Sequence, residues 1–374
     1  MWRTAKRTVV WSVLALTGCA VVDAPRTPEP HIAAAVPYTA LAGWQADAFD
    51  GVLDAVLAQC AAPSTAGTGS LCAVAQTGLP IALRDHLMQH YRPHAVLGDA
   101  GAEDGLITGY YEPLLHGSVA PNARYRWPLY RRPRDLVTLD LAERYPELEG
   151  RRVRGRLVEQ RVVPYWTRAD IDGPEQPLAG DELLWVDDPV DAFFLHVQGS
   201  GLVALADGRV ESVGYSDQNG HPYRSIGRVL VDLDEVALED VSLFSIRAWL
   251  ADNPDAAQAL LNENPSYVFF ERRGDRGDDG PLGTLGVPLT AERSIAVDPR
   301  VIPLGSLVWL DTTLDDGQPY RRLMVAQDTG GAIAGGPRAD VFFGRGERAE
   351  RLAGTQKSRG RLYVFRPVES DGGG

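Results

Sequence analysis

Residues 324–344 read MVAQDTGGAIAGGPRADVFFG, a stretch in which two apolar segments flank a loop rich in glycine. The apolar segments are short and contain β-branched or aromatic residues, as strands do, and glycine lets the backbone approach another backbone or a ligand closely. Asp328 and Asp340 lie on either side of the loop. A strand, a loop and a returning strand could bring them together, so this stretch predicts a β fold with two neighbouring carboxylates.

The two aspartates admit a catalytic and a structural interpretation. In the apolar surroundings of Ala339, Val341 and Phe342, desolvation would raise the pKa of Asp340, as a general acid for glycoside cleavage requires. Aspartates beside glycines also cap turns, and the local pattern alone favours that second role.

Other catalytic classes find less support in the sequence. Asp328-Thr-Gly matches the signature of aspartic proteases, but a protease needs a second copy or a homodimer, and the chain holds one copy. A Gly-x-Ser-x-Gly motif is missing. His86 and His90 are one helical turn apart, but Leu87 replaces the glutamate of His-Glu-x-x-His, which favours a solvated helix face over a metal site.

Outward from this stretch, helical and β patterns alternate along the chain. Apolar spacing is helical within 38–94 and again within 225–262, whereas 106–213 contains short β-rich runs, among them 106–111, 152–163 and 193–197. Further strands are expected at 266–270, 293–297, 306–311, 321–327, 339–343 and 361–365. A mature chain of about 350 residues exceeds what one core usually covers, so we expect two domains.

The N-terminus has the layout of an export signal: Arg3, Lys6 and Arg7 precede an apolar run that is too short to span a bilayer. It ends in Leu16-Thr-Gly-Cys19, which resembles the lipobox of bacterial lipoproteins. We therefore expect a signal peptide at 1–18, an acylated Cys19 as membrane anchor, and a flexible tether at 19–37. Ala20 in place of Asp favours the outer membrane, with the protein facing the periplasm.

Charge and cysteine content limit the classes of binding partner and the cellular compartment that we expect. The net charge of −13 at pH 7 argues against nucleic acid or an anionic lipid surface as the partner. Besides Cys19 the chain has Cys60 and Cys72, for which a short-loop disulfide in an oxidising periplasm and two free thiols both remain open. The tail at 369–374 is expected to be disordered.

Three further stretches combine hydroxyl, amide and aromatic groups, as carbohydrate-binding grooves do. They are Thr108-Gly-Tyr-Tyr-Glu-Pro113, His196-Val-Gln-Gly-Ser-Gly201 and Val213-Gly-Tyr-Ser-Asp-Gln-Asn-Gly-His-Pro-Tyr-Arg224. Each by itself is better explained by packing or by a turn.

Together and in this order, these stretches resemble the membrane-bound lytic murein transglycosylase A family over about 106–365. Val297-Asp-Pro-Arg-Val-Ile-Pro-Leu-Gly305 and Asp328-Thr-Gly-Gly-Ala-Ile333 add to the resemblance. The C-terminal part resembles a domain named for three aspartates, which correspond to Asp298, Asp328 and Asp340.

This resemblance implies a mainly β fold with flanking helices. A double-psi β-barrel domain would comprise 38–112 and 237–368, a second β-barrel-like domain would be inserted at 113–236, and a groove would lie between them. The residue pattern agrees with β, then helix, then β, but does not give the barrel topology.

The resemblance also implies the reaction and its residues. The substrate would be the glycan strands of peptidoglycan, cleaved at the β-1,4 bond between N-acetylmuramic acid and N-acetylglucosamine to leave 1,6-anhydromuramic acid ends, without metal or organic cofactor. Asp340 would act as acid and then as base, Asp328 would support it, and Asp298 would be structural. Sugar-binding residues would be Thr108, Tyr110, Tyr111, Gln198, Gly199, Ser200 and Tyr215.

Two alternatives stay open at the level of sequence. One is a noncatalytic peptidoglycan-binding lipoprotein in which Asp340 is structural. The other is a lysozyme-like muramidase that uses Asp328 and Asp340 as a carboxylate pair, because a hydrolase normally needs two.

Overall fold

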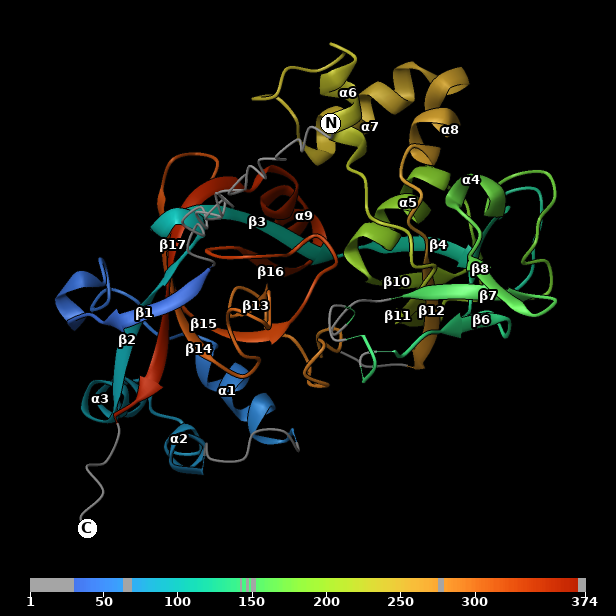
Figure 1. Ribbon diagram of the computed structural model, residues 1–374. Helices are drawn as coiled ribbons and strands as arrows, with labels where there is room; N and C mark the ends of the chain where they lie inside the picture. Colours follow the sequence, from blue (N-terminus) through green and yellow to red (C-terminus); the bar gives the residue numbers. More distant parts are fainter. Residues whose placement is uncertain are drawn as a thin grey trace, which may run out of the picture.

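The computed structural model describes residues 30–62, 69–141, 143–145, 148, 153–274 and 279–368. The expected signal peptide, Cys19, most of the tether and the tail at 369–374 lie outside these ranges. The described part is mainly β, with three sheets and helices around them, as Figure 1 shows. Among the helices of this part, none is both long enough and apolar enough to cross a membrane.

The first sheet has eight strands in the order β1-β2-β17-β14-β15-β13-β16-β3. β3 pairs with β17 as well as with β16, so pairing runs from β17 through β14, β15, β13 and β16 to β3 and returns to β17. Within this circuit, β13–β15 and β16–β3 are parallel pairs. The strands are β1 (His31–Ala35), β2 (Tyr91–Leu97), β3 (Gly105–Glu112), β13 (Ser294–Val297), β14 (Leu307–Thr313), β15 (Pro319–Asp328), β16 (Ala339–Arg345) and β17 (Lys357–Pro367).

The second sheet has six strands in the order β12-β11-β10-β4-β9-β5, and a third sheet has the order β6-β7-β8. β12 falls in the range 237–368 expected for the first domain, yet it pairs with β11 here. The strands are β4 (Leu114–Ser118), β5 (Trp127–Tyr130), β6 (Leu136–Thr138), β7 (Arg154–Val158), β8 (Arg161–Pro164), β9 (Glu182–Val186), β10 (Ser200–Leu205), β11 (Val210–Gln218) and β12 (Val268–Gly274).

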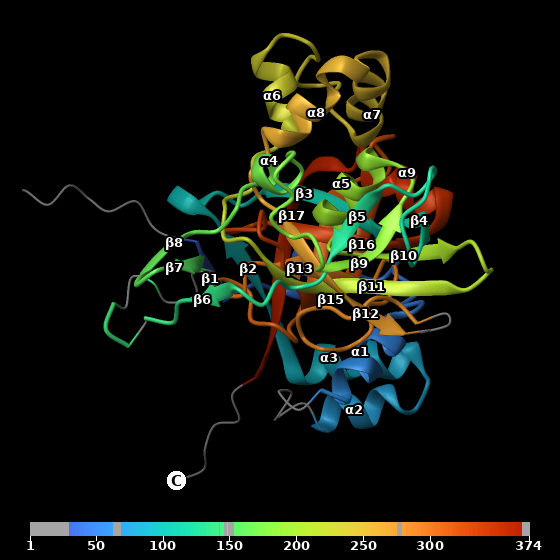
Figure 2. The ribbon, with the colours of Figure 1, turned by 90° about the vertical axis from the view of Figure 1, so that its right-hand side faces the viewer.

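Helices cover the two ends of the molecule. α1 to α3 lie at one end and α6 to α8 at the opposite end in both views of Figures 1 and 2. The helices are α1 (Val52–Cys60), α2 (Gly69–Ala75), α3 (Pro80–His90), α4 (Arg168–Ile171), α5 (Pro189–Gln198), α6 (Ile226–Asp232), α7 (Leu243–Asp252), α8 (Pro254–Asn262) and α9 (Gly346–Thr355), with 3-10 turns η1 (Tyr38–Ala40) and η2 (Asp99–Gly101).

Separate hydrophobic clusters hold these layers together. The N-terminal helices share one cluster with β14, β15 and β17, in which the rings of Trp44 and Trp309 meet edge to face with centroids 5.2 Å apart. A disulfide between Cys60 and Cys72 joins α1 to α2, which decides between the two alternatives that the sequence left open. α6 to α9 share another cluster with the inner strands of the first sheet, and α5 packs with the second sheet.

One strand expected from the sequence is wrong. Residues 193–197 belong to helix α5, not to a β run. The side chain of Asp188 caps this helix by accepting hydrogen bonds from the backbone N–H groups of Val190 and Asp191, Pro189 occupies its first turn, and Gly199 ends it with φ of 81°. These features fix a helix because they satisfy its free N–H groups and allow a left-handed C-terminal residue.

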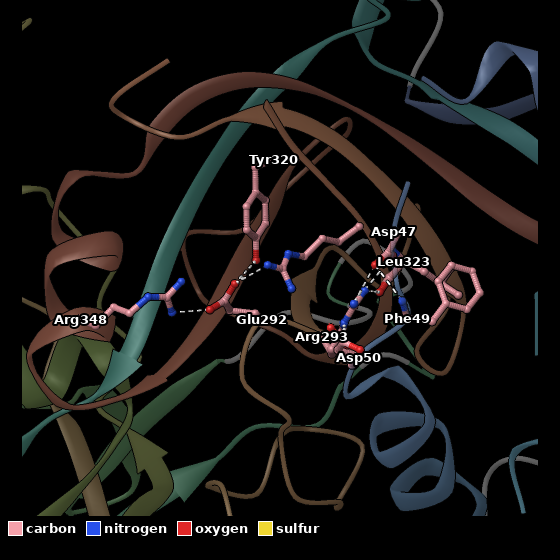
Figure 3. Close-up of polar contacts among 9 residues, drawn as sticks. Asp47, Phe49, Asp50, Glu292, Arg293, Tyr320, Leu323 and Arg348 are labelled. Carbon is pink, nitrogen blue, oxygen red and sulfur yellow. Dashed lines mark hydrogen bonds and ion pairs between the residues drawn. The ribbon is translucent and has the colours of Figure 1, made fainter. Parts of the chain in front are cut away.

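Two carboxylate clusters lie at the start of β13 (Figure 3). The buried Asp47 forms an ion pair with Arg293, whose Nη1 and Nη2 each lie 2.8 Å from a carboxylate oxygen, while its Nε donates to the Asp50 carbonyl. The adjacent Glu292 accepts hydrogen bonds from Tyr320 Oη and Arg348, and forms an ion pair with Arg322. These contacts attach β13 to the N-terminal segment, to β15 and to α9.

Candidate active site

Asp340 is the second residue of β16, and its neighbours come from the strands on both sides. In the pairing register it lies opposite Ala296 of β13 and Thr108 of β3. The Thr108 hydroxyl donates a hydrogen bond of 2.6 Å to Asp340 Oδ1. The apolar residues expected around Asp340, namely Ala339, Val341 and Phe342, are buried.

The surroundings of Asp340 favour its protonated form. Burial raises the pKa of Asp340, and the negative charge of Asp328 acts in the same direction. The nearby charge of Arg338 and the hydrogen bond from Thr108 oppose this, but the net direction is upward. A carboxyl group with a raised pKa can hold a proton near neutral pH, as a general acid must.

Asp328 ends β15 and also lies opposite Ala296 of β13. The two aspartates are therefore on strands that flank β13, at the same level. Because paired strands are about 4.8 Å apart, two strand spacings put their backbones roughly 10 Å from each other. The strand register thus brings together the two acidic residues that the sequence singled out.

β3 supplies a side chain to each aspartate. Thr108 and Tyr110 are two residues apart and so point to the same face of the strand. Thr108 donates to Asp340, and Tyr110 Oη donates to Asp328 Oδ2 at 3.0 Å. Burial and the neighbouring aspartates raise the pKa of Tyr110, so its hydroxyl keeps the proton that it donates.

Thr284 is a site residue that the sequence did not reveal. Its backbone N–H and its hydroxyl both donate to Asp328 Oδ1 at 2.9 Å, and the backbone N–H of Thr329 donates to the same oxygen at 2.9 Å. Burial still raises the pKa of Asp328, against these donors. Neither a spacing rule nor a motif pointed to Thr284, because it lies far from Asp328 in the chain.

Asp298 fixes the loop that leads to Asp340. Its carboxylate accepts hydrogen bonds from the Arg300 guanidinium and from the backbone N–H of Gly335. Burial would raise the pKa of Asp298, but these hydrogen bonds bring it below its ordinary value. Its carboxylate is thus engaged in holding the loop.

Tyr111 and Gln198 connect the first sheet to the second. The backbone N–H of Tyr111 donates to Gln198 Oε1 at 3.0 Å, and Tyr111 Oη donates to Glu350 of α9 at 3.0 Å. Tyr111 is thus buried between elements and away from the aspartates. Gln198 is the last residue of α5 and Gly199 its C-cap, so both are placed by the end of that helix.

Ser200 and Tyr215 lie on neighbouring strands of the second sheet. Ser200 begins β10 opposite Gly214, the residue before Tyr215 on β11, so the two side chains point to opposite faces of the sheet. Both side chains are half-buried. Over the ranges that the structure describes, His, Cys, Asp and Glu residues do not gather into a group that could hold a metal ion.

The sequence matches two known domain families and known proteins. The model of the MltA specific insert domain matches residues 106–271, and that of the 3D domain matches residues 293–366. The chain is 34% identical over 275 residues to the membrane-bound lytic murein transglycosylase A of Escherichia coli (strain K12), which covers 71% of this chain and 67% of that protein.

Solved structures agree with these sequence matches. The structure of a membrane-bound lytic murein transglycosylase from Agrobacterium tumefaciens superposes with a TM-score of 0.79 at 32% identity, covering 90% of this chain and 98% of that one. The structure of E. coli MltA with bound chitohexaose superposes with a TM-score of 0.71 at 25% identity, covering 91% and 95%.

Proposed function

The chain belongs to the membrane-bound lytic murein transglycosylase A family, and from the geometry of its site we propose that Asp340 is the acid and base of the reaction. The protein is a lytic murein transglycosylase, a lyase that cleaves peptidoglycan. The observation that carries the proposal is the pair of aspartates flanking Ala296. Burial raises the pKa of both, and the Asp340 carboxylate accepts a hydrogen bond from Thr108.

In the first step, protonated Asp340 gives its proton to the oxygen between N-acetylmuramic acid and N-acetylglucosamine. The bond from muramic C1 to this oxygen breaks, and C1 gains oxocarbenium character. In the second step, the Asp340 carboxylate takes the proton of the muramic C6 hydroxyl as that oxygen bonds to C1. The product is a 1,6-anhydro ring, Asp340 is protonated again, and water is not consumed.

In this proposal, Asp328 stabilises the two reaction steps electrostatically. Its Oδ1 accepts three hydrogen bonds from Thr284 and Thr329, and its Oδ2 accepts one from Tyr110, so each oxygen already has a donor. A covalent or base role, as in a lysozyme-like muramidase, would need an oxygen free to meet the sugar or a water molecule. The hydrogen bonding of Asp328 therefore favours the lytic reaction.

The fold proposal follows from the strand pairing. The circuit from β17 through β14, β15, β13 and β16 to β3 supports a double-psi β-barrel domain formed by 38–112 and by 237–368 without β12. We assign β12 to the inserted domain, with 113–236, because β12 pairs with β11. We expect the glycan groove between the two domains, with Thr108 and Tyr110 on one side and Ser200 and Tyr215 on the other.

The substrate and anchoring proposals draw on the relatives. E. coli MltA was solved with bound chitohexaose, which supports a glycan strand as the occupant of the groove. The E. coli relative is named as membrane-bound. In this chain, lipid on Cys19 would hold the protein at the outer membrane, facing the periplasm.

Asp340→Asn tests the catalytic proposal. The carboxamide keeps the shape of the side chain but cannot deliver and retrieve a proton, so release of soluble muropeptides from purified sacculi should fall by at least about a thousandfold. Mass spectrometry of the wild-type products should give 1,6-anhydro ends, which lack one water relative to reducing ends.

Asp315→Asn is the matched control, because Asp315 is exposed in the turn between β14 and β15. It should leave muropeptide release unchanged. Release by Asp340→Asn at the wild-type rate would refute the catalytic role and favour a structural Asp340. Products with reducing ends would instead indicate a muramidase.

A further inference from the structure

The segment 279–290 links β12 of the second sheet to β13 of the first and lies against the end of β15. The backbone N–H of Leu285 donates to the carbonyl of Gln327 at 3.0 Å. At Gly283 a Cβ atom would lie 2.5 Å from the Gln327 carbonyl oxygen, so a larger residue would push the segment away. Leu289 at its far end is buried with Tyr110 and Phe342. We call residues 279–290 the strap.

The strap also reaches the expected sugar-binding side of the molecule. Pro281 and Leu282 face Ser200 and Gly214 across a cavity of about 10 Å³, too small for more than one water molecule. The strap thus lines a cavity with the second sheet at one point and contacts Asp328 at another.

Thr284 occupies the part of the strap that meets Asp328. Its hydroxyl donates to Asp328 Oδ1, so the contact of 2.8 Å between the two threonine hydroxyls uses the proton of Thr329. The resulting chain runs from the Thr329 hydroxyl through the Thr284 hydroxyl to the carboxylate. Linked donors of this kind polarise one another and strengthen a hydrogen bond to a charged acceptor.

The two aspartates differ in the number of hydrogen bonds that stabilise their ionised forms. Asp328 accepts four hydrogen bonds, two from Thr284 and one each from Thr329 and Tyr110, whereas Asp340 accepts one side-chain hydrogen bond, from Thr108, among the residues that the structure describes. Donors stabilise an ionised carboxylate, and two neighbouring carboxylates resist ionising together. The negative charge therefore belongs on Asp328 and the proton on Asp340.

From this arrangement we propose that Thr284 is a positioning residue that holds Asp328 as the ionised partner of Asp340 and so keeps the catalytic proton on Asp340. The inference rests on the proposed function. Thr284 acts through Asp328 and does not touch the reacting atoms. The charged and titratable groups that face the pair are Tyr110 from β3 and Arg338 from the loop before β16.

Thr284→Val tests the proposal, because it removes the hydroxyl and keeps the backbone donor and the branched shape. Loss of a donor raises the pKa of Asp328, so Asp328 becomes ionised only at higher pH. The acidic limb of the kcat/KM profile should therefore move up by about half a pH unit, with about a threefold loss of kcat/KM on the acidic side. The basic limb should stay in place, because Asp340 loses its proton beside an Asp328 that is already ionised.

Thr284→Ser restores the hydroxyl and should recover the wild-type profile, whereas Thr290→Val, at the other end of the strap, should not change it. In an Asp328→Asn background, Thr284→Val should have little further effect, because both variants remove the same charge interaction. A wild-type pH profile for Thr284→Val, or full additivity with Asp328→Asn, would overturn the proposal. Activity of Asp340→Asn would instead refute the proposed function itself.

Discussion

At the scale of single residues, hydrogen bonds to the two aspartates define the site. Thr108 is the next side chain to test after Thr284. Its hydrogen bond to Asp340 stabilises the ionised carboxylate and so lowers the pKa of Asp340. Thr108→Val should therefore raise that pKa and move the basic limb of the kcat/KM profile up by about one pH unit. Thr284→Val, by contrast, should move the acidic limb and leave the basic limb in place.

A pH-rate profile on soluble glycan strands measures the shift, and Thr108→Ser is the control that keeps the hydroxyl. A basic limb that stays in place or moves down in Thr108→Val would contradict the assignment of this limb to Asp340. A rise in KM alone, with an unchanged profile, would mean that Thr108 only binds sugar.

At this scale the sequence singled out Asp328 and Asp340, and also Thr108 and Tyr110, but neither Thr284 nor the hydrogen bonds that set the protonation of the aspartates. The short glycine-rich loop was enough to expect the two aspartates near each other, although β13 lies between their strands. Thr284 and Tyr110 reach Asp328 through strand register and through the strap, which depend on long-range pairing. Such contacts leave no periodic signal in a single sequence.

Elements differ in how well they could be predicted. The strands that contain the aspartates were predicted within a few residues, because short apolar runs bounded by Gly or Pro are distinctive. α5 was taken for a strand because Phe193, Phe194 and Leu195 form a continuous apolar run, although Asp188-Pro189 and Gly199 carried the helix-end signals. α9 was missed because its sequence is mostly polar and buries little more than Ala349.

The ion pair of Asp47 and Arg293 is the strongest link between the N-terminal segment and β13. Both side chains are almost fully buried, at 4% and 2% exposed, and Asp47 also accepts from the backbone N–H of Leu323. Removing one partner leaves the other charge buried and unpaired, so Asp47→Ala should cost about 3–5 kcal/mol of unfolding free energy. Urea unfolding at pH 7 measures the loss.

The stabilisation by this ion pair should decrease at low pH. Burial alone would raise the pKa of Asp47, but Arg293 and the backbone donors outweigh it and lower the pKa. The stabilisation is therefore complete above the unfolded-state pKa of about 3.9 and is lost as pH falls through the lower folded-state value. Asp311→Ala, which breaks the more exposed pair with Arg321, should cost under about 1 kcal/mol. Equal costs for the two variants would contradict the role of the buried pair.

For the whole molecule, the two sheets are joined by few but specific contacts around the site. Gln198 accepts from the backbone of β3, and the strap runs from β12 past Asp328 to β13. The net charge of −13 gives the molecule no broad attraction for an acidic polymer. In the proposal, binding of a glycan therefore depends on specific contacts and not on net charge.

This arrangement predicts that a residue of the second sheet matters for binding although it does not touch the aspartates. In the inactive Asp340→Asn protein, Tyr215→Ala should weaken binding of chitohexaose about tenfold, because an aromatic ring beside a sugar contributes about 1.4 kcal/mol. Isothermal titration calorimetry measures the change without turnover.

Tyr223→Ala is the informative control, because Tyr223 lines a separate open cavity of about 500 Å³ with Arg224 and Glu263. It should leave chitohexaose binding unchanged if the glycan lies between Tyr215 and the aspartates. The reverse result, with affinity lost in Tyr223→Ala and kept in Tyr215→Ala, would place the sugar in that cavity. The glycan would then be bound away from Asp340, and a groove between the two sheets could not be the binding site.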